Sequence, residues 1–131
     1  MSVFVDTSAL LALLDADDVH HDEARDTWER LADADVLLAT TNYVLLETAA
    51  VVQHRLGVNA VRALFCEIAP LMDLVFVDAI VHEAAVAALL AAGRRHLSLV
   101  DCSSFEVMRR GDIARAWAFD RHFAEQGFEL E

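Results

Sequence analysis

The side chains best suited to chemistry in this sequence are four carboxylates set among apolar or hydroxyl residues. They are Asp6 in VFVDTSALLALL, Glu47 in YVLLETAAVV, Asp101 in SLVDCSSF and Asp120 in AFDRHF. Clustered carboxylates repel one another unless a cation neutralises them, and an all-oxygen set of ligands suits Mg²⁺ or Mn²⁺. Such an ion holds a phosphate oxygen and activates a bound water. Phosphodiester hydrolysis is therefore the chemistry that these four residues could support together.

Each of the three aspartates also has a purely local explanation. Asp6 and Asp120 each follow a β-like run and precede a helical one, so each can cap a helix with a side-chain oxygen. Ser98 and Asp101 have the spacing of a capping box. Taken singly, each aspartate is explained better as a cap than as a ligand. Their combination favours a site, because an α/β fold brings such positions to one edge of the sheet.

Glu47 has no capping role, because apolar residues surround it on every face of the expected helix. A buried carboxylate without a partner costs several kcal/mol, so Glu47 requires a cation or a hydrogen-bond donor. The two alternatives are a metal ion shared with the aspartates and a buried ion pair with an arginine such as Arg55 or Arg121.

The charge of the chain limits its function. There are 22 acidic and ten basic residues, a net charge of −12, and every basic residue is arginine. The absence of lysine argues against a Walker A loop, and against phosphatases and receiver domains that use a lysine beside a catalytic aspartate. A negative surface repels nucleic acid at long range, so RNA binding would depend on metal or on local arginines. Arg94, Arg95, Arg109 and Arg110 lie near expected helix ends, either as solvated charges that favour the helix dipole or as phosphate contacts.

Length and composition predict a single domain over residues 1–131, large enough to fold without disulfides. Acidic residues interrupt the apolar runs too often for a membrane span and no basic leader opens the chain, so we expect a cytoplasmic protein. Cys66 and Cys102 fit no metal-binding spacing and are expected to be free thiols.

The pattern of apolar residues predicts alternating strands and helices, and hence a three-layer α/β/α fold around a parallel sheet of four to five strands. The expected strands are 3–5, 36–40, 74–77 and 114–119, with a short final strand at 128–130. The expected helices are 7–14, 21–33, 41–56, 59–70, 80–92, 101–110 and 120–126. Four glycines follow expected helices closely enough to cap them in the left-handed conformation: Gly57, Gly93, Gly111 and Gly127.

The segments VFVDTSALLALL, TTNYVLLETA, LSLVDCSSFEVM and AFDRHF resemble, in this order, the four acidic motifs of PIN-domain ribonucleases, in particular VapC-type toxins of toxin–antitoxin pairs. The resemblance covers the whole chain. It implies a metal-dependent endoribonuclease that acts on RNA, with the four carboxylates around Mg²⁺ or Mn²⁺ and a hydroxyl of Thr7 or Ser8 beside them. It also implies the strand order 3-2-1-4-5, a homodimer, and an antitoxin whose C-terminal segment wraps the toxin. The acidity of the site favours a basic segment.

One position departs from the pattern of that family. Many members carry Thr or Ser two residues before the last aspartate, where this chain has Ala118. A hydroxyl of Ser103 or Ser104 is the expected replacement. The competing hypothesis is a non-catalytic PIN-like module that binds RNA or protein and whose carboxylates pair with arginines of another chain.

Two further groups of residues are not expected to belong to the site. Asp78 ends a second VFVD segment, but in the implied strand order its strand lies at the edge of the sheet, so we expect a helix cap. His20 and His21 lack a third ligand at a usable spacing and are not expected to bind zinc. The apolar segments AVRALFCEIAPLM and EAAVAALLAAG favour a homodimer.

Overall fold

A computed structural model describes all 131 residues, and its centre is a five-stranded parallel sheet in the order β3-β2-β1-β4-β5. The strands are β1 (Ser2–Val5), β2 (Leu37–Thr41), β3 (Asp73–Val75), β4 (Arg115–Trp117) and β5 (Glu129–Leu130). The central strand β1 pairs with β2 and β4, so that Val3 lies opposite both Leu38 and Arg115. Val3, Phe4 and Val5 are fully buried, as expected for a parallel sheet covered on both faces. The predicted fold class and strand order are confirmed.

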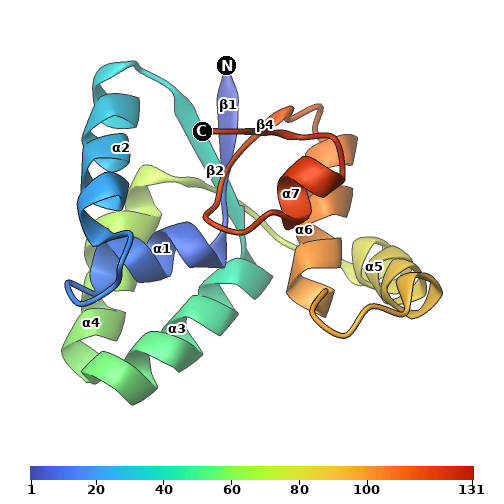
Figure 1. Ribbon diagram of the computed structural model, residues 1–131, viewed down its shortest axis with the longest axis horizontal. Coiled ribbons are helices and arrows are strands. Elements are labelled where there is room, and N and C mark those ends of the chain that lie inside the picture. The colour runs from blue at the N-terminus through green and yellow to red at the C-terminus, as the bar shows by residue number, and fades with distance from the viewer.

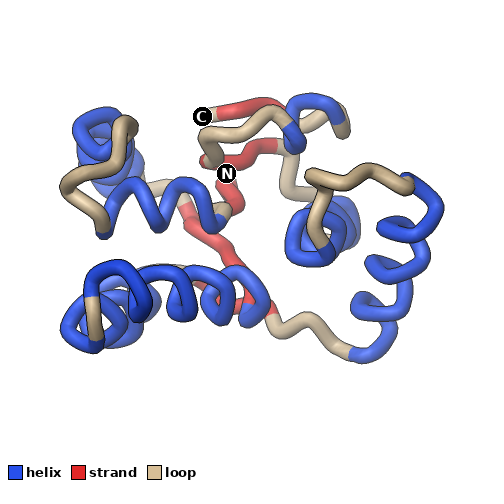
Figure 2. Tube along the Cα trace, turned by 60° about the horizontal axis from the view of Figure 1, so that its bottom comes forward, coloured by secondary structure: helices blue, strands red, loops and turns tan.

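Seven α-helices cover the sheet, and Figures 1 and 2 show them on both of its sides. One side carries α1 (Thr7–Leu14), α2 (His21–Asp33), α3 (Asn42–Leu56) and α4 (Val58–Ala63). The other side carries α5 (Ala79–Ala92), α6 (Leu99–Arg110) and α7 (His122–Glu125). None of these helices combines the length and the apolar character needed to cross a bilayer.

The strand order creates a place for a ligand. The chain proceeds outward from β1 through β2 to β3, then crosses back to β4 on the other side of β1. The connections that leave β1 and β4 therefore run to opposite faces of the sheet. A crevice opens outside the carboxyl ends of two strands at such a point.

Two expected elements are interrupted or shortened. Residues 59–70 were expected as one helix, but α4 gives way to a π-helical turn over Leu64–Ile68 and a 3₁₀ turn over Ala69–Leu71. Pro70 lacks an amide hydrogen and its ring clashes with the carbonyl four residues earlier, so a regular helix cannot continue through it. The expected strand 114–119 ends at Trp117, because the Phe119 amide donates to Ser8 Oγ (2.9 Å) instead of continuing the ladder.

The glycine caps were predicted only in part. Gly93 adopts the left-handed conformation after α5, and Gly127 has a positive φ of 91° after α7. Gly57 also has a positive φ, but its ψ of −175° is not left-handed helical, and Gly111 has a φ of −95°. The left-handed residue after α6 is Asp112, with φ of 54°. The prediction of a left-handed cap is therefore wrong at Gly57 and Gly111. After α6 the Schellman turn closes one residue later than Gly111, around Asp112. Aspartate tolerates the left-handed conformation better than most residues.

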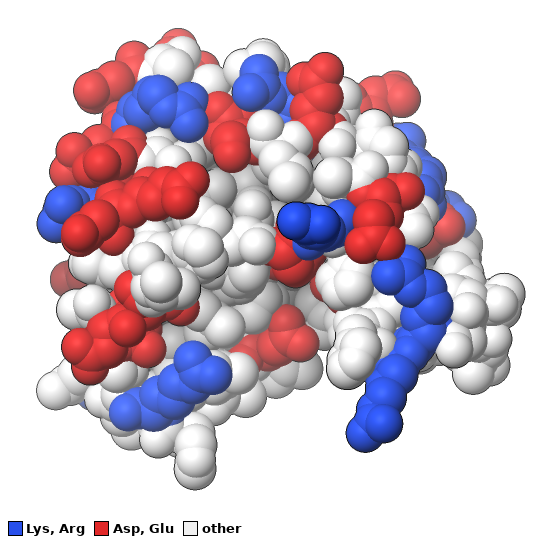
Figure 3. Space-filling view, in the orientation of Figure 1, with Lys and Arg blue, Asp and Glu red and all other residues white.

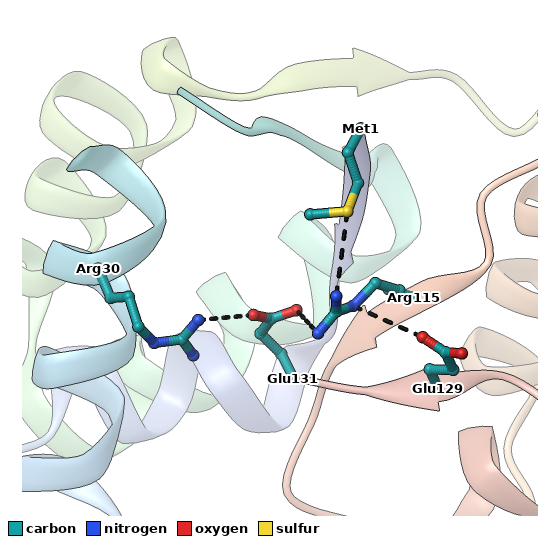
Figure 4. Close-up of polar contacts among 5 residues, drawn as sticks. All are labelled: Met1, Arg30, Arg115, Glu129 and Glu131. Atoms are coloured by element: carbon teal, nitrogen blue, oxygen red, sulfur yellow. Dashed lines mark hydrogen bonds and ion pairs between the residues drawn. The ribbon is translucent and has the colours of Figure 1, made fainter. Parts of the chain in front are cut away.

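An ion-pair network holds the end of the molecule where both termini lie (Figure 4). The Glu131 carboxylate accepts from Arg30 Nη1 at 2.8 Å and lies 2.9 Å from Arg115 Nη2. Only 4% of the Glu131 side chain is exposed, so this pairing joins α2 to β4 with little competition from solvent. Figure 1 shows this end of the sheet far from the first turns of α1, α3 and α6.

Candidate active site

A hollow of about 280 Å³ lies at the carboxyl ends of β1 and β4. Figure 1 shows the first turns of α1, α3, α6 and α7 converging there. Only one residue of its wall, Leu11, is apolar. The remaining lining residues are Asp6, Thr7, Ser8, Glu47, His96, Ser98, Asp101, Asp120 and His122. The structure therefore brings all four predicted carboxylates to one place, from four different elements or loops.

Asp6 is both a helix cap and a member of this cluster. Its Oδ2 accepts from the backbone amide of Ser8 (3.1 Å) and from Ser8 Oγ (2.7 Å). Ser8 Oγ in turn accepts from the Phe119 amide, so one serine fixes the carboxylate and ties it to the loop after β4. The side chain is only 2% exposed. Asp6 thus has a fixed orientation before any ligand arrives.

The pKa of Asp6 is raised from its ordinary value of 3.8 to about 7. Burial is the largest cause, because it removes the charged form from water. The hydrogen bonds from Ser8 oppose this effect, whereas the negative charges of Asp120 and Asp101 add to it. Burial and two neighbouring carboxylates thus disfavour the ionised form of Asp6, and a cation bound beside it would offset both effects.

Asp101 and Asp120 are also held by their own backbone. Ser98 and Asp101 form the predicted capping box, in which Asp101 Oδ2 accepts from the Ser98 amide at 3.1 Å. Burial and the charge of Asp120 raise the pKa of Asp101, whereas hydrogen bonds from Ser98 lower it. Asp120 Oδ1 accepts from the His122 amide at 3.0 Å. In each aspartate of the cluster, one oxygen satisfies a backbone amide and the other makes no hydrogen bond within the chain.

Glu47 lies on the second turn of α3, and the structure corrects two expectations about it. It is half-buried rather than enclosed, and its side chain borders the acidic hollow. It also forms no ion pair, so the expected alternative of a salt bridge with Arg55 or Arg121 is wrong. Glu47 additionally borders a neighbouring apolar hollow of about 390 Å³ between α3 and α6, lined by Tyr43, Leu46, Ala50, Leu99 and Val100.

The hydroxyl groups are distributed differently from the expectation. Ser103 and Ser104 are fully buried and donate to the Val100 carbonyl, so they cannot replace the hydroxyl absent at position 118. Ala118 is itself buried in the core. Thr7 lines the hollow, and its buried Oγ1 has no hydrogen-bond partner. Thr7 therefore offers a free hydroxyl beside Asp6.

Two histidines of the hollow escaped the sequence analysis. His96 lies in the turn before α6 and His122 opens α7, and the positive charge that His122 can carry lowers the pKa of Asp101. The available signal was the dipeptide Arg-His, which occurs twice, each time close to an acidic motif. His20 and His21 lie elsewhere, as expected: the His20 ring stacks on Phe119 at 4.5 Å and His21 Nδ1 lies 2.8 Å from the Ala12 carbonyl.

Asp78 is also placed as expected. Its carboxylate caps α5 by accepting from the Val81 amide at 3.0 Å, and it does not line the acidic hollow. The second VFVD segment therefore ends in a helix cap outside the acidic hollow.

The donor set of the hollow fits a hard divalent cation. No three His, Cys, Asp or Glu side chains come close enough to ligate a single ion directly as they stand. Mg²⁺ commonly uses one or two carboxylates and completes its shell with waters and substrate phosphates. Asp6 would hold such an ion together with Asp120 or Asp101, whose charges act on it, and the remaining carboxylates and the unpartnered Thr7 hydroxyl would hold bound waters.

Comparison with known proteins agrees with this geometry. The PIN domain family model matches residues 3–129. A protein of Mycobacterium tuberculosis named 23S rRNA-specific endonuclease VapC20 is 36% identical over 127 residues, covering 96% of this chain and 95% of that protein. The crystal structure of VapC20, described as a sarcin-ricin loop cleaving toxin, superposes with a TM-score of 0.84 at 34% identity, over 96% of this chain and 95% of the other.

Two more distant structures share the fold. VapBC2 from Rickettsia felis, bound to a promoter DNA fragment, gives a TM-score of 0.73 at 15% identity, over 100% of this chain and 98% of the other. A structure of FitAcB from Neisseria gonorrhoeae gives 0.69 at 15% identity, over 99% and 96%. Given the model match over nearly the whole length and the 36% identity, the chain belongs to the PIN-domain family and, within it, to the VapC-type toxins.

Proposed function

We propose that this chain is a metal-dependent endoribonuclease that hydrolyses phosphodiester bonds of cytoplasmic RNA as the toxin of a toxin–antitoxin pair. The observation that carries the proposal is the hollow at the switch point, where four carboxylates converge and the pKa of Asp6 rises to about 7. A chain without a catalytic role gains nothing from holding these charges together. The family relationship makes RNA the expected polyanion.

The residues of the hollow have two roles, orienting the carboxylates and binding the ion. Ser8, the capping box of Ser98, and the amide of His122 each fix one aspartate oxygen, which leaves the other oxygen oriented for a ligand. Glu47 reaches the same space from α3 and makes no ion pair that would compete. When bound there, Mg²⁺ or Mn²⁺ supplies neutralising charge, a contact to a phosphate oxygen and a water of lowered pKa. Preset carboxylates cost little reorganisation when that ion arrives.

The substrate class follows from the relative. VapC20 carries the name of a 23S rRNA-specific endonuclease and is described as cleaving the sarcin-ricin loop. With 36% identity over 96% of this chain, we propose a loop of large-subunit ribosomal RNA as the substrate. Proteins read RNA sequence best in single-stranded loops, where bases are unstacked.

The decisive experiment maps the 5′ ends that purified protein produces on total RNA and on intact ribosomes. We expect one dominant cut in a large-subunit rRNA loop, present with Mg²⁺ or Mn²⁺ and absent in EDTA. Four variants should each lose most of the cleavage while remaining folded: Asp6→Asn, Glu47→Gln, Asp101→Asn and Asp120→Asn. The absence of new 5′ ends with any divalent cation would instead favour the non-catalytic binding module.

An antitoxin and a second copy of the chain are the proposed partners. A basic C-terminal segment of the antitoxin would place a guanidinium against the carboxylates. The same segment would place its apolar side chains in the neighbouring hollow between α3 and α6. The homodimer is suggested by large apolar side chains left exposed on the segments named for it, such as Phe65, Leu71 and Leu90. Inhibition that weakens as salt rises, and a dimer mass by light scattering, are the expected results.

A further inference from the structure

The arginines of this chain are not equally available to bind a phosphate. Five of them lie within 4.0 Å of a carboxylate oxygen: Arg25, Arg30, Arg94, Arg110 and Arg115. Arg109 donates to Gln126 and lies over the rings of Phe105 and Phe128. The arginines that remain without a carboxylate partner are Arg55, Arg62, Arg95 and Arg121. In a chain of net charge −12, these are the cations that a polyanion could use.

Two of these free arginines are chain neighbours of residues that line the acidic hollow. Arg95 and Arg121 are each followed directly by a histidine, and both histidines, His96 and His122, line the hollow. One Arg-His pair comes from the turn before α6 and the other from the start of α7. The two pairs are therefore placed by different parts of the fold on the rim of one hollow.

The local structure holds both pairs in place. Arg95 and His96 are the central residues of a turn closed by a hydrogen bond from the Leu97 amide to the Arg94 carbonyl (3.3 Å), and Leu97 is buried. Arg94 Nη2 lies 2.9 Å from Glu125 Oε2 on α7, which links this turn to the second Arg-His pair. Arg94 is thus engaged in an ion pair with α7, whereas Arg95 remains exposed and unpaired.

The surface view agrees with this arrangement (Figure 3). Blue arginine side chains stand beside recessed acidic atoms near the middle of the face and continue along the side covered by α6 and α7. Acidic side chains dominate the side covered by α2. Arginine side chains, with acidic ones between them, therefore stand on the α6 and α7 side of these recessed acidic atoms.

We propose that Arg95 and Arg121 bind backbone phosphates of the RNA on either side of the bond to be cut. The inference rests on the proposed ribonuclease function and adds how an acidic protein retains its polyanionic substrate. A guanidinium pairs with two phosphate oxygens at once, and each such contact with single-stranded RNA releases counterions. Phosphate contacts of this kind align the strand and contribute little to sequence choice.

The test uses three variants that each remove one exposed arginine: Arg95→Ala, Arg121→Ala and, as the matched control, Arg55→Ala. Arg55 is also exposed and unpaired but lies in the last turn of α3, on the other side of the sheet, and its removal changes the net charge by the same amount. Binding of a fluorescent single-stranded oligoribonucleotide is followed by anisotropy in an Asp6→Asn background, where most of the cleavage is expected to be lost, and in the presence of EDTA. Steady-state cleavage is measured in the parent background.

We expect Arg95→Ala and Arg121→Ala each to weaken binding by about three- to tenfold and to lower the slope of log affinity against log salt by about 0.7 between about 50 and 200 mM salt. In cleavage, KM should rise with kcat nearly unchanged, because a phosphate contact persists from ground state to transition state. Arg55→Ala should match the parent in every measurement. If Arg95→Ala and Arg121→Ala behave like Arg55→Ala while the parent cleaves RNA, the inference is overturned and the proposed function is retained. If the parent binds RNA through these arginines but cleaves none, the phosphate-binding role of Arg95 and Arg121 is retained and the proposed ribonuclease function is wrong.

Discussion

Replacement of Asp6 by asparagine should change two measurable properties in opposite directions, the stability of the metal-free protein and its cleavage of RNA. The amide oxygen of asparagine can still accept the two hydrogen bonds from Ser8, so the first turn of α1 is preserved. What disappears is a carboxyl whose pKa is raised to about 7 by burial and by the charges of Asp120 and Asp101. We therefore expect the Asp6→Asn variant to gain stability without metal while it loses cleavage.

The sign and size of the effect follow from proton binding. Below pH 3.8 Asp6 is protonated in both the folded and the unfolded chain. As pH rises from about 4 to about 7, the unfolded chain releases this proton and the folded chain retains it, so the free energy of unfolding falls. The loss is complete about one pH unit above 7, where the folded chain has released the proton as well. The difference between 3.8 and about 7 corresponds to at most about 4–5 kcal/mol, at about 1.4 kcal/mol per pH unit.

The assay is urea unfolding in EDTA at a series of pH values, with the parent, Asp6→Asn and, as a control, Asp78→Asn. The advantage of Asp6→Asn over the parent should grow from pH 4 to pH 7 and then level off, by up to about 3 kcal/mol between pH 5 and pH 8. Asp78→Asn removes the same charge at an exposed cap and controls for the change in net charge. Mn²⁺ at pH 8 should stabilise the parent and leave Asp6→Asn unaffected. An Asp6→Asn variant that is less stable than the parent at pH 8 in EDTA would refute the reasoning.

Three further outcomes test the rest of the structure. Asp78→Ala should lower the free energy of unfolding by about 1 kcal/mol through the lost cap and leave RNA cleavage unchanged; reduced cleavage at full stability would contradict its placement. Glu131→Ala should destabilise the fold by about 1–2 kcal/mol, because Arg115 loses its nearest carboxylate, again with unchanged cleavage per folded molecule. Iodoacetamide followed by mass spectrometry should label exposed Cys66 in the native protein and Cys102 only after unfolding, since burial and the charge of Asp101 raise the pKa of the Cys102 thiol.

The sequence predicts most of the fold because its signals are local. Asp6 follows a β-branched run that becomes the fully buried centre of the sheet, and Ser98 and Asp101 form the capping box that their spacing indicates. The interruption of the helix expected at 59–70 was also a local matter, since Pro70 stands inside it. These features depend on residues within a turn or two of one another, which a single sequence displays.

The remaining features depend on packing between distant elements. Glu47 is less buried than its apolar neighbours indicate, because exposure is decided by which face of α3 another helix covers. His96 and His122 enter the hollow because the turn before α6 and the start of α7 meet there, 26 positions apart in the chain. The shortened β4 depends on one hydrogen bond, from Phe119 to Ser8, across more than a hundred residues.

The choice between cap and ligand at Asp6, Asp101 and Asp120 was posed as an alternative, but a carboxylate has two oxygens. Capping uses one of them and immobilises the group, which lowers the entropy that a ligand must remove when it binds. The helix starts at Asp6 and Asp101, and the loop that carries Asp120, also converge on the switch point of the sheet, so that all three side chains line the hollow. The same local hydrogen bonds that begin α1 and α6 therefore orient the acidic cluster. Burial first, and then the charges of Asp120 and Asp101, raise the pKa of Asp6, and a cation bound in the hollow would relieve the repulsion among these carboxylates.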